Sequence, residues 1–317
     1  VGAGPCGLAA AIACKRAGLD VLVIEKGPLV HSIYRYPTYM IFHSTPDLLE
    51  IGGIPFSTAN EKPTRQEALN YYRLVANREQ LPVHCYETVT AAQKTADGFA
   101  VDTTDRFGQQ HRYESRYLVI ATGYFDHPNR LDVPGENLPK VFSFYKEAHP
   151  YAGMKVAVVG ANNSAVDAAM ELERAGAEVT VICRRAELSD KVKAWTRPVF
   201  ESMVKKGRIQ IYYRSTVEAI EERFIRVKTE DGVITLENDF VFTLIGYRPD
   251  RTFLQSLGVQ SDPQTGVPQH HPETMETNVP GLYIAGVVAA GNHANAIFIE
   301  NGRFHGEQIA RHIQSLS

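Results

Sequence analysis

The chain has 317 residues, of which 44% are hydrophobic, and a formal net charge of -3 at neutral pH. The length predicts about two domains, and the apolar fraction suffices for two buried cores. Lysine and arginine are scattered and balanced by acidic residues, which excludes the basic field of a nucleic-acid-binding protein, and no apolar run is long enough for a membrane span.

The cysteines and the first residues argue against a disulfide-rich, metal-binding or secreted protein. The four cysteines show no CxxC spacing and no His/Cys cluster, so we expect neither a disulfide framework nor a bound metal. The chain starts without the charged and apolar segments of a signal peptide, which favours a cytoplasmic protein. We expect a small-molecule or small-protein partner.

The first predicted element is a nucleotide-binding loop, GAGPCG at residues 2–7, followed by a helix over residues 6–17. In such a loop the first glycine allows a tight turn, the second lets the backbone approach a pyrophosphate, and the third lets the helix pack on its strand. Residues 20–25 predict an apolar strand that ends at Glu25, a carboxylate that can accept hydrogen bonds from ribose hydroxyls. This unit therefore favours an unphosphorylated ribose, as in FAD or NAD.

The next segments continue an α/β pattern. Helical periodicity covers residues 64–78, and alternating residues predict strands at 99–103 and 111–113, followed by an apolar strand at 117–120. Residues 124–153 contain several prolines and glycines, which favour a connection between two domains.

A second nucleotide-binding unit follows this connection. Residues 156–175 repeat the strand, loop and helix, with GANNSA at 160–165, and a further strand at 179–183 ends in Arg184 and Arg185. Asparagine stands where the first loop has its second glycine, and asparagine tolerates the backbone of the turn better than most residues. Two guanidinium groups suit the extra 2′-phosphate of NADPH, so we interpret the first unit as the FAD site and the second as the NADPH site.

The last third of the chain completes both domains. Strands are predicted at 209–213 and 240–245, with a hairpin turning at 231–232 between them, and a strand at 282–286 and a helical pattern at 294–313 return to the first domain. The predicted fold is therefore α/β, with two Rossmann-like three-layer nucleotide-binding domains. The NADPH domain, 143–251, is inserted in a discontinuous FAD domain, 1–142 and 252–317.

The chain resembles the two-dinucleotide-binding flavoproteins, the family of the low-molecular-weight thioredoxin reductases, over nearly its whole length. Four markers occur in family order: the first loop with Glu25, then Ala121-Thr122-Gly123, then the second loop with its two arginines, then residues 281–286. Val287 stands where that family has the aspartate that reaches the flavin ribityl chain. The CxxC that relays electrons to a protein substrate is absent, which argues against thioredoxin reduction.

Within this family the chain is similar to the YpdA-type bacillithiol-disulfide reductases of Gram-positive bacteria. The shared phrases lie at residues 4–7, 42–53, 163–167 and 298–303. The resemblance implies an FAD- and NADP-dependent oxidoreductase of redox homeostasis, with a low-molecular-weight disulfide as substrate and a homo-oligomeric assembly.

The resemblance also assigns cofactor residues in this sequence. Expected at FAD are Gly2, Gly4, Pro5, Cys6, Gly7, Glu25, Lys26, Ser44, Thr45, Thr122, Gly123 and Gly286. Expected at NADPH are Gly160, Asn162, Asn163, Ser164, Ala165, Arg184 and Arg185.

Cys6 is the candidate catalytic residue, because the family's proposed redox-active cysteine occupies this place in the first loop. A helix N-terminus stabilises a thiolate, whereas a neighbouring pyrophosphate raises a thiol pKa. The expected reaction is hydride transfer from NADPH to flavin, followed by attack of Cys6 on a disulfide and resolution of the mixed disulfide. The alternative is that Cys6 only fills a packing position.

Three other functions remain compatible with the sequence. A ferredoxin-NADP reductase of the thioredoxin-reductase type shares both nucleotide sites and also lacks CxxC. A flavin monooxygenase is less well supported, because its FxGxxxH signature is not intact here. A regulatory flavoprotein that senses NADPH would keep both sites without turnover.

Overall fold

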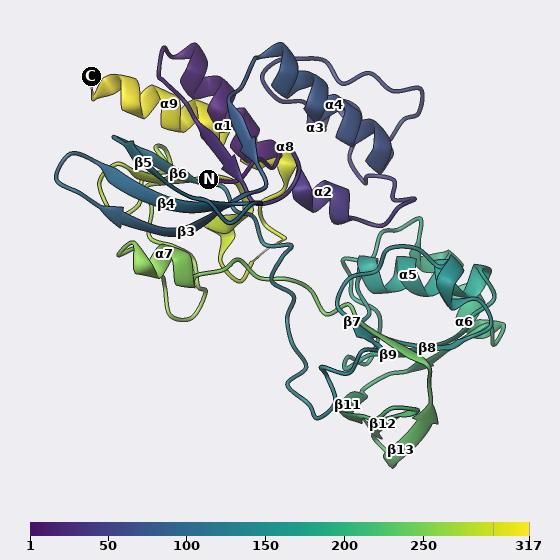
Figure 1. Cartoon of the computed structure of the whole chain (residues 1–317). Helices are drawn as coiled ribbons and strands as arrows, with labels where there is room; N and C mark the ends of the chain where they lie inside the picture. The colour runs from purple at the N-terminus through teal and green to yellow at the C-terminus, as the bar shows by residue number, and fades with distance from the viewer. Residues whose placement is uncertain (294, 317) are drawn as a thin grey trace. The chain divides into compact units, whose positions relative to one another are not determined.

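The computed structural model describes residues 1–293 and 295–316, which form two compact units (Figure 1). Unit 1 contains residues 1–127 and the described residues from 247 onward, and unit 2 contains residues 128–246. The sequence placed the boundaries after residues 142 and 251. Residues 128–142 instead group with unit 2, because strand β7 (Val141–Phe142) pairs with β14 (Phe240–Thr243) in its sheet.

Parallel strands form the centre of unit 1. Strand β1 (Val23–Glu25) pairs with β2 (Val83–Cys85), and β6 (Leu118–Ile120) pairs with β15 (Leu282–Ile284). The first two residues lie between these pairs: the Gly2 N–H donates to the Ile24 carbonyl at 2.8 Å, and the Ala121 N–H donates to the Val1 carbonyl at 2.8 Å. The chain start thereby joins the two pairs into one layer.

Helices and an antiparallel sheet surround this layer. Helix α1 (Pro5–Arg16) packs against α9 (His305–Ser315), and the antiparallel sheet has the order β3-β4-β5. Phe99 and Val101 of that sheet share a buried cluster with Leu118 and Ile120 of the parallel layer. The remaining elements of unit 1 are α2 (His31–Arg35), α3 (Pro46–Leu49), α4 (Arg65–Arg78), β3 (Glu87–Lys94), β4 (Phe99–Asp105), β5 (Gln110–Ser115), α7 (Thr252–Ser256), the 3₁₀ helix η2 (Gly286–Ala290) and α8 (Ile299–Gly302).

Strand β3 and the C-terminal helical segment of unit 1 differ from the sequence prediction. Strand β3 was not predicted, and the helical pattern predicted from Ala294 to Ile313 is divided into α8 and α9. Ala294 itself, like Ser317 at the end of the predicted FAD domain, lies outside the described residues.

Unit 2 is built in three layers. Its five-stranded sheet has the order β10-β9-β8-β14-β7 and is parallel throughout. Along β8 (Lys155–Val159), Val156 and Val158 pack in one buried cluster with helices α5 and α6, while Ala157 and Val159 pack in another with the antiparallel sheet β11-β12-β13. This period of two places one layer on each face. The further elements are η1 (His149–Tyr151), α5 (Asn163–Arg174), β9 (Glu178–Ile182), α6 (Arg197–Lys205), β10 (Ile209–Tyr212), β11 (Thr216–Ile220), β12 (Phe224–Thr229) and β13 (Gly232–Glu237).

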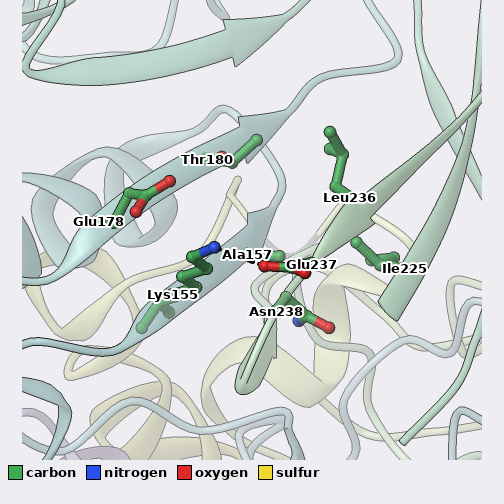
Figure 2. Close-up of a pocket in the computed structure, with 9 residues that line it drawn as sticks. Lys155, Ala157, Glu178, Thr180, Ile225, Leu236, Glu237 and Asn238 are labelled. Atoms are coloured by element: carbon green, nitrogen blue, oxygen red, sulfur yellow. Dashed lines mark hydrogen bonds and ion pairs between the residues drawn. The ribbon is translucent and has the colours of Figure 1, made fainter. Parts of the chain in front are cut away.

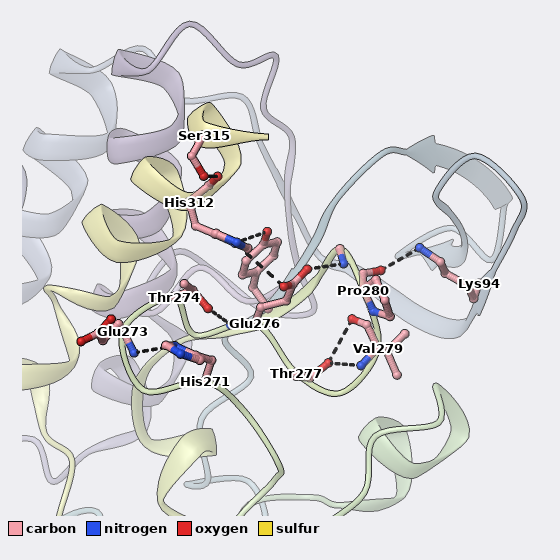
Figure 3. A network of polar contacts seen from close by, with 12 residues as sticks. Lys94, His271, Glu273, Thr274, Glu276, Thr277, Val279, Pro280, His312 and Ser315 are labelled. Carbon is pink, nitrogen blue, oxygen red and sulfur yellow. Dashed lines mark hydrogen bonds and ion pairs between the residues drawn. The ribbon is translucent and has the colours of Figure 1, made fainter. Parts of the chain in front are cut away.

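A polar network fastens α9 to the loop before β15 (Figure 3). The His312 Nδ1 lies 2.9 Å from the Tyr283 hydroxyl and 4.0 Å from a carboxylate oxygen of Glu276. The other carboxylate oxygen of Glu276 accepts the Gly281 N–H at 2.7 Å. Tyr283 is fully buried, so its hydroxyl needs such a partner.

Within residues 1–293 and 295–316, no helix combines the length and the apolar character that crossing a membrane requires.

Candidate functional site

The first glycine loop has the backbone that its sequence predicts. Gly2 has φ +100°, and a Cβ there would lie 2.5 Å from the Ala121 carbonyl oxygen. A Cβ on Gly7 would lie 2.1 Å from the Gly2 carbonyl oxygen, so the start of α1 approaches the loop too closely for any side chain. A Cβ on Gly4 would meet no atom within 4 Å. The open side of the loop at Gly4 therefore fits a pyrophosphate at the helix N-terminus.

Glu25 ends β1 beside this loop, and its carboxylate is buried at 7% exposure. One oxygen accepts the Ala3 N–H at 2.7 Å, and the other accepts the Gly27 N–H at 3.0 Å. Glu25 thus holds the backbone of the glycine loop in place. Each carboxylate oxygen keeps a second acceptor position for a ribose hydroxyl.

Lys26, which the sequence places at the cofactor, is paired with a carboxylate that sequence reasoning missed. Its Nζ lies 2.8 Å from Asp126, and Arg35 contacts the other oxygen of Asp126 at 2.6 Å. Burial alone would raise the pKa of Asp126, but the hydrogen bond and the charges of these two cations hold it below its ordinary value. Asp126 is therefore a fixed anion that orients Lys26.

Cys6 lies in the first turn of α1 against two glycines from the end of the chain. A Cβ on Gly286 would lie 3.0 Å from the Cys6 sulfur, and a Cβ on Gly302 would lie 2.9 Å from it. Cys6 keeps some solvent exposure, but burial of the group raises the pKa of its thiol to about 12. Desolvation thus prevails over the helix N-terminus, and the thiol is protonated at neutral pH.

His305 reaches the same place from the first turn of α9. Its Nδ1 accepts the Gly286 N–H at 3.1 Å. Burial lowers the pKa of His305 to about 4, so the ring is neutral at neutral pH and Nδ1 is the unprotonated nitrogen. The ring therefore fixes the backbone next to Cys6.

Helix α8 connects the remaining predicted flavin residues of unit 1 to this site. The Ser44 hydroxyl donates to Glu300, and Arg303 donates to the carbonyls of Asp47 at 2.6 Å and Glu50 at 2.8 Å. Thr45 is the N-cap residue of α3. These contacts hold α3 against α8.

The Ala121-Thr122-Gly123 marker borders the same loop. Thr122 is exposed, Gly123 has φ +71°, and the carbonyl of Ala121 is the atom that forces glycine at position 2.

In unit 2, the second glycine loop leads into α5. Gly160 has φ +129°, and a Cβ there would lie 2.4 Å from the Leu244 carbonyl oxygen. Asn162 is the N-cap of α5, and its side-chain oxygen accepts the Asn163 N–H at 3.0 Å. Ser164 is exposed at the helix start, while Ala165 is buried. This geometry fits a phosphate group at the helix N-terminus.

Arg184 and Arg185 follow β9 and are exposed. Among the described residues, neither guanidinium is within ion-pair distance of a carboxylate. Two unpaired guanidinium groups at the end of the second strand fit the 2′-phosphate of NADPH. The residues of this loop predicted for NADPH thus share one edge of the sheet, except that the Asn163 side chain bonds elsewhere in the protein.

A small pocket of unit 2 lies away from this loop (Figure 2). It is at the amino end of β8, where Lys155 pairs with Glu237 at 2.6 Å, whereas the glycine loop follows the carboxyl end of that strand. Nucleotides bind at the carboxyl ends of parallel strands, so this pocket is not the cofactor site. Its lining residues are Lys155, Val156, Ala157, Glu178, Thr180, Ile225, Leu236, Glu237 and Asn238.

Comparison with known proteins agrees with this geometry. Residues 1–286 match the family described as "Pyridine nucleotide-disulphide oxidoreductase". This chain belongs to that family. A relative named bacilliredoxin reductase Bdr, from Bacillus subtilis, is 50% identical over 99% of this chain and 96% of its own length.

Two solved structures are similar to this chain in both sequence and fold. Bacillithiol disulfide reductase Bdr (YpdA) from Bacillus cereus is 48% identical with a TM-score of 0.98, covering 100% of this chain and 98% of its own. The protein of the same name from Staphylococcus aureus is 46% identical with a TM-score of 0.96, covering 100% and 97%. The predicted thioredoxin-reductase-like α/β fold is thereby confirmed, and family membership implies the use of a flavin and a nicotinamide nucleotide.

Several site residues were missed from sequence alone. Asp126, Glu300, Gly302 and His305 all contact predicted site residues. The phrase at 298–303 was recognised as a shared marker, and that marker was the available signal for Glu300 and Gly302. Nothing in the local sequence pointed to Asp126 or His305.

Proposed function

We propose that this protein is an FAD-containing, NADPH-dependent reductase of a low-molecular-weight disulfide, with bacillithiol disulfide as the substrate. The observation that carries the proposal is the placement of Cys6 in the first turn of α1, beside the glycine loop and against Gly286 and Gly302. The likeness to two proteins named bacillithiol disulfide reductase supports the choice of substrate.

Each unit has its own set of proposed cofactor residues, supported by the two glycine loops. The loop at 2–7 and Glu25 would hold FAD, with Lys26, Ser44, Thr45, Thr122, Gly123 and Gly286 around it. The loop at 160–165 with Arg184 and Arg185 would hold NADPH. When bound, the two cofactors supply the pair of electrons that cleavage of a disulfide requires.

Cys6 performs the thiol chemistry in this proposal. Its sulfur attacks one sulfur of the substrate, so that a mixed disulfide forms and one thiol leaves with a proton. Two electrons and two protons then release the second thiol and restore the Cys6 thiol; NADPH supplies both electrons and one proton, and solvent supplies the other proton. Because burial raises the pKa of Cys6, the attacking sulfur must lose its proton as the substrate arrives. The rate of attack therefore increases with pH through the neutral range.

The first test is anaerobic consumption of NADPH by the FAD-loaded protein with bacillithiol disulfide as sole acceptor. We expect two thiols per NADPH, and we expect Cys6→Ala to lose turnover while NADPH still bleaches the flavin. Cys85→Ala is the matched control, because Cys85 is a free cysteine on β2. If NADPH bleaches the flavin of the unaltered protein but is not consumed in the presence of the disulfide, bacillithiol disulfide is not the substrate. Ferredoxin-type acceptors would then be tested next.

Cytoplasmic location stays a prediction from the sequence, and assembly as a homo-oligomer stays a prediction from the resemblance. A sedimentation measurement on the FAD-loaded protein tests the assembly, and a monomer would contradict it.

A further inference from the structure

The side chain of Asn163 is engaged within unit 2 on both of its polar atoms. Its Nδ2 donates to the Lys191 carbonyl at 2.8 Å, and its Oδ1 accepts the Lys193 N–H at 3.0 Å. Making both contacts fixes the orientation of the amide. Close by, the Ser189 N–H donates to the Ala161 carbonyl at 3.2 Å. The segment 188–197, here called the basic loop, is therefore fastened to the second glycine loop.

Two buried side chains and one hydrogen bond also hold the basic loop in place. Leu188 and Val192 are buried in the core of unit 2, with 2% and 5% exposure. The Arg197 guanidinium donates to the Ser189 carbonyl at 2.9 Å, which closes the loop on itself. Lys191 is exposed. The loop thus has a defined backbone course beside the start of α5, with a cationic side chain on its surface.

Charge on this part of the surface is predominantly positive. Residues 184–197 carry five basic side chains and two acidic ones, Glu187 and Asp190. Of the five, Arg197 is used to close the loop, as described above. Among the described residues, Arg184, Arg185, Lys191 and Lys193 have no carboxylate within ion-pair distance. Four cations without anionic partners therefore border the second glycine loop.

We propose that Asn163 is a positioning residue for NADPH: it holds the basic loop so that Lys191 and Lys193 join Arg184 and Arg185 around the phosphates. This inference rests on the proposed use of NADPH and changes the expected role of Asn163 from direct contact to support. Arginine binds a phosphate through a planar fork of donors, whereas lysine acts as a mobile point charge that gains most when its backbone is fixed.

The test uses 2′,5′-ADP, which carries phosphates on the 2′ and 5′ oxygens of the ribose and has no redox chemistry. Its Kd is measured by calorimetry on the full-length, FAD-loaded protein. We expect Asn163→Ala and the double variant K191A/K193A each to weaken binding by roughly tenfold. The triple variant should bind no more weakly than the double variant, because coupled residues do not contribute additively. The losses should shrink at high salt, which screens the lysines.

The matched control is K205A/K206A, which removes two exposed lysines at the end of α6, and its Kd should be unchanged. Additive losses in the triple variant would show that Asn163 contacts the nucleotide itself and would overturn the inference. Unchanged binding by K191A/K193A would overturn it as well, including when Asn163→Ala fails to fold. Unaltered protein that binds 2′,5′-ADP no more tightly than 5′-AMP would refute the choice of NADPH, a separate failure that also removes the inference.

Discussion

The titration of Cys6 gives a direct measure of its surroundings. Burial raises the pKa of this thiol from an ordinary 9.0 to about 12. A shift of three pH units lowers the thiolate fraction at neutral pH by roughly a thousandfold, and only the thiolate is alkylated. We therefore expect iodoacetamide to modify Cys6 in the folded protein roughly a thousand times more slowly than in the chain unfolded by denaturant.

The assay is the rate of Cys6 alkylation from pH 6 to pH 11, read by mass spectrometry of the peptide that contains it. The pH dependence separates a raised pKa from poor access: with a pKa of about 12 the rate still rises at pH 11, whereas poor access lowers all rates without changing the pH at which they level off. A rate that levels off below about pH 10 would refute the argument from desolvation. The Cys6→Ala variant identifies the peptide signal.

The same shift predicts how stability depends on pH. A thiol whose pKa is raised by folding keeps its proton longer in the folded state than in the unfolded chain. Its contribution is fully present below pH 9 and is lost progressively as pH rises from about 9 to about 12. The free energy of unfolding of the unaltered protein should fall faster over this range than that of Cys6→Ala, as urea unfolding at several pH values would reveal.

Three further substitutions test contacts of unit 1, each by urea unfolding. Glu25→Gln replaces a carboxylate that accepts two backbone N–H groups by an amide whose NH₂ faces one of those donors. We expect the free energy of unfolding to fall by about 1–3 kcal/mol and FAD to be retained less well on gel filtration. Unchanged retention would contradict the role of this carboxylate at the flavin. Arg303→Met removes the hydrogen-bond donor to the carbonyls of Asp47 and Glu50, so we expect the free energy of unfolding to fall by about 1–3 kcal/mol. An unchanged free energy would mean that α3 is held by other contacts. Gly306→Val introduces a Cβ only 2.5 Å from the Ala10 backbone, which should cost about 1–3 kcal/mol through displacement of α9 from α1, and Ser315→Val on the outer end of α9 serves as control.

Much of the fold follows from local pattern. The glycine loops, the apolar strands beside them and their following helices were placed within a few residues, because glycine spacing and apolar runs are local signals. The first strand is shorter than predicted, since only residues 23–25 find a partner in β2. Strand β3 was missed because its residues are mostly exposed and polar, which leaves no alternation to detect.

The site was less accessible to sequence reasoning where it depends on distant segments. The contacts of Cys6 with Gly286 and Gly302 join the first turn of α1 to η2 and α8, which are distant in the sequence, and no local rule predicts such packing. The Asn163 side chain was expected at the nucleotide, because a motif gives a residue its position and leaves the direction of its side chain undetermined. The bonds to residues 191 and 193 arise only once the loop after β9 has folded back.

The packing of α9 on α1 has a consequence for biosynthesis. Unit 2 is one uninterrupted stretch, 128–246, so a ribosome that has released residue 246 has supplied everything that this unit contains. Unit 1 is completed later, because α1 precedes unit 2 in the chain and α9, which packs on α1, follows it. Until α9 has been synthesised, the apolar face of α1 lacks this cover, and exposed apolar surface makes the nascent chain prone to aggregation. Ribosomes that stall after residue 246 would leave a folded unit 2 joined to an unfinished unit 1.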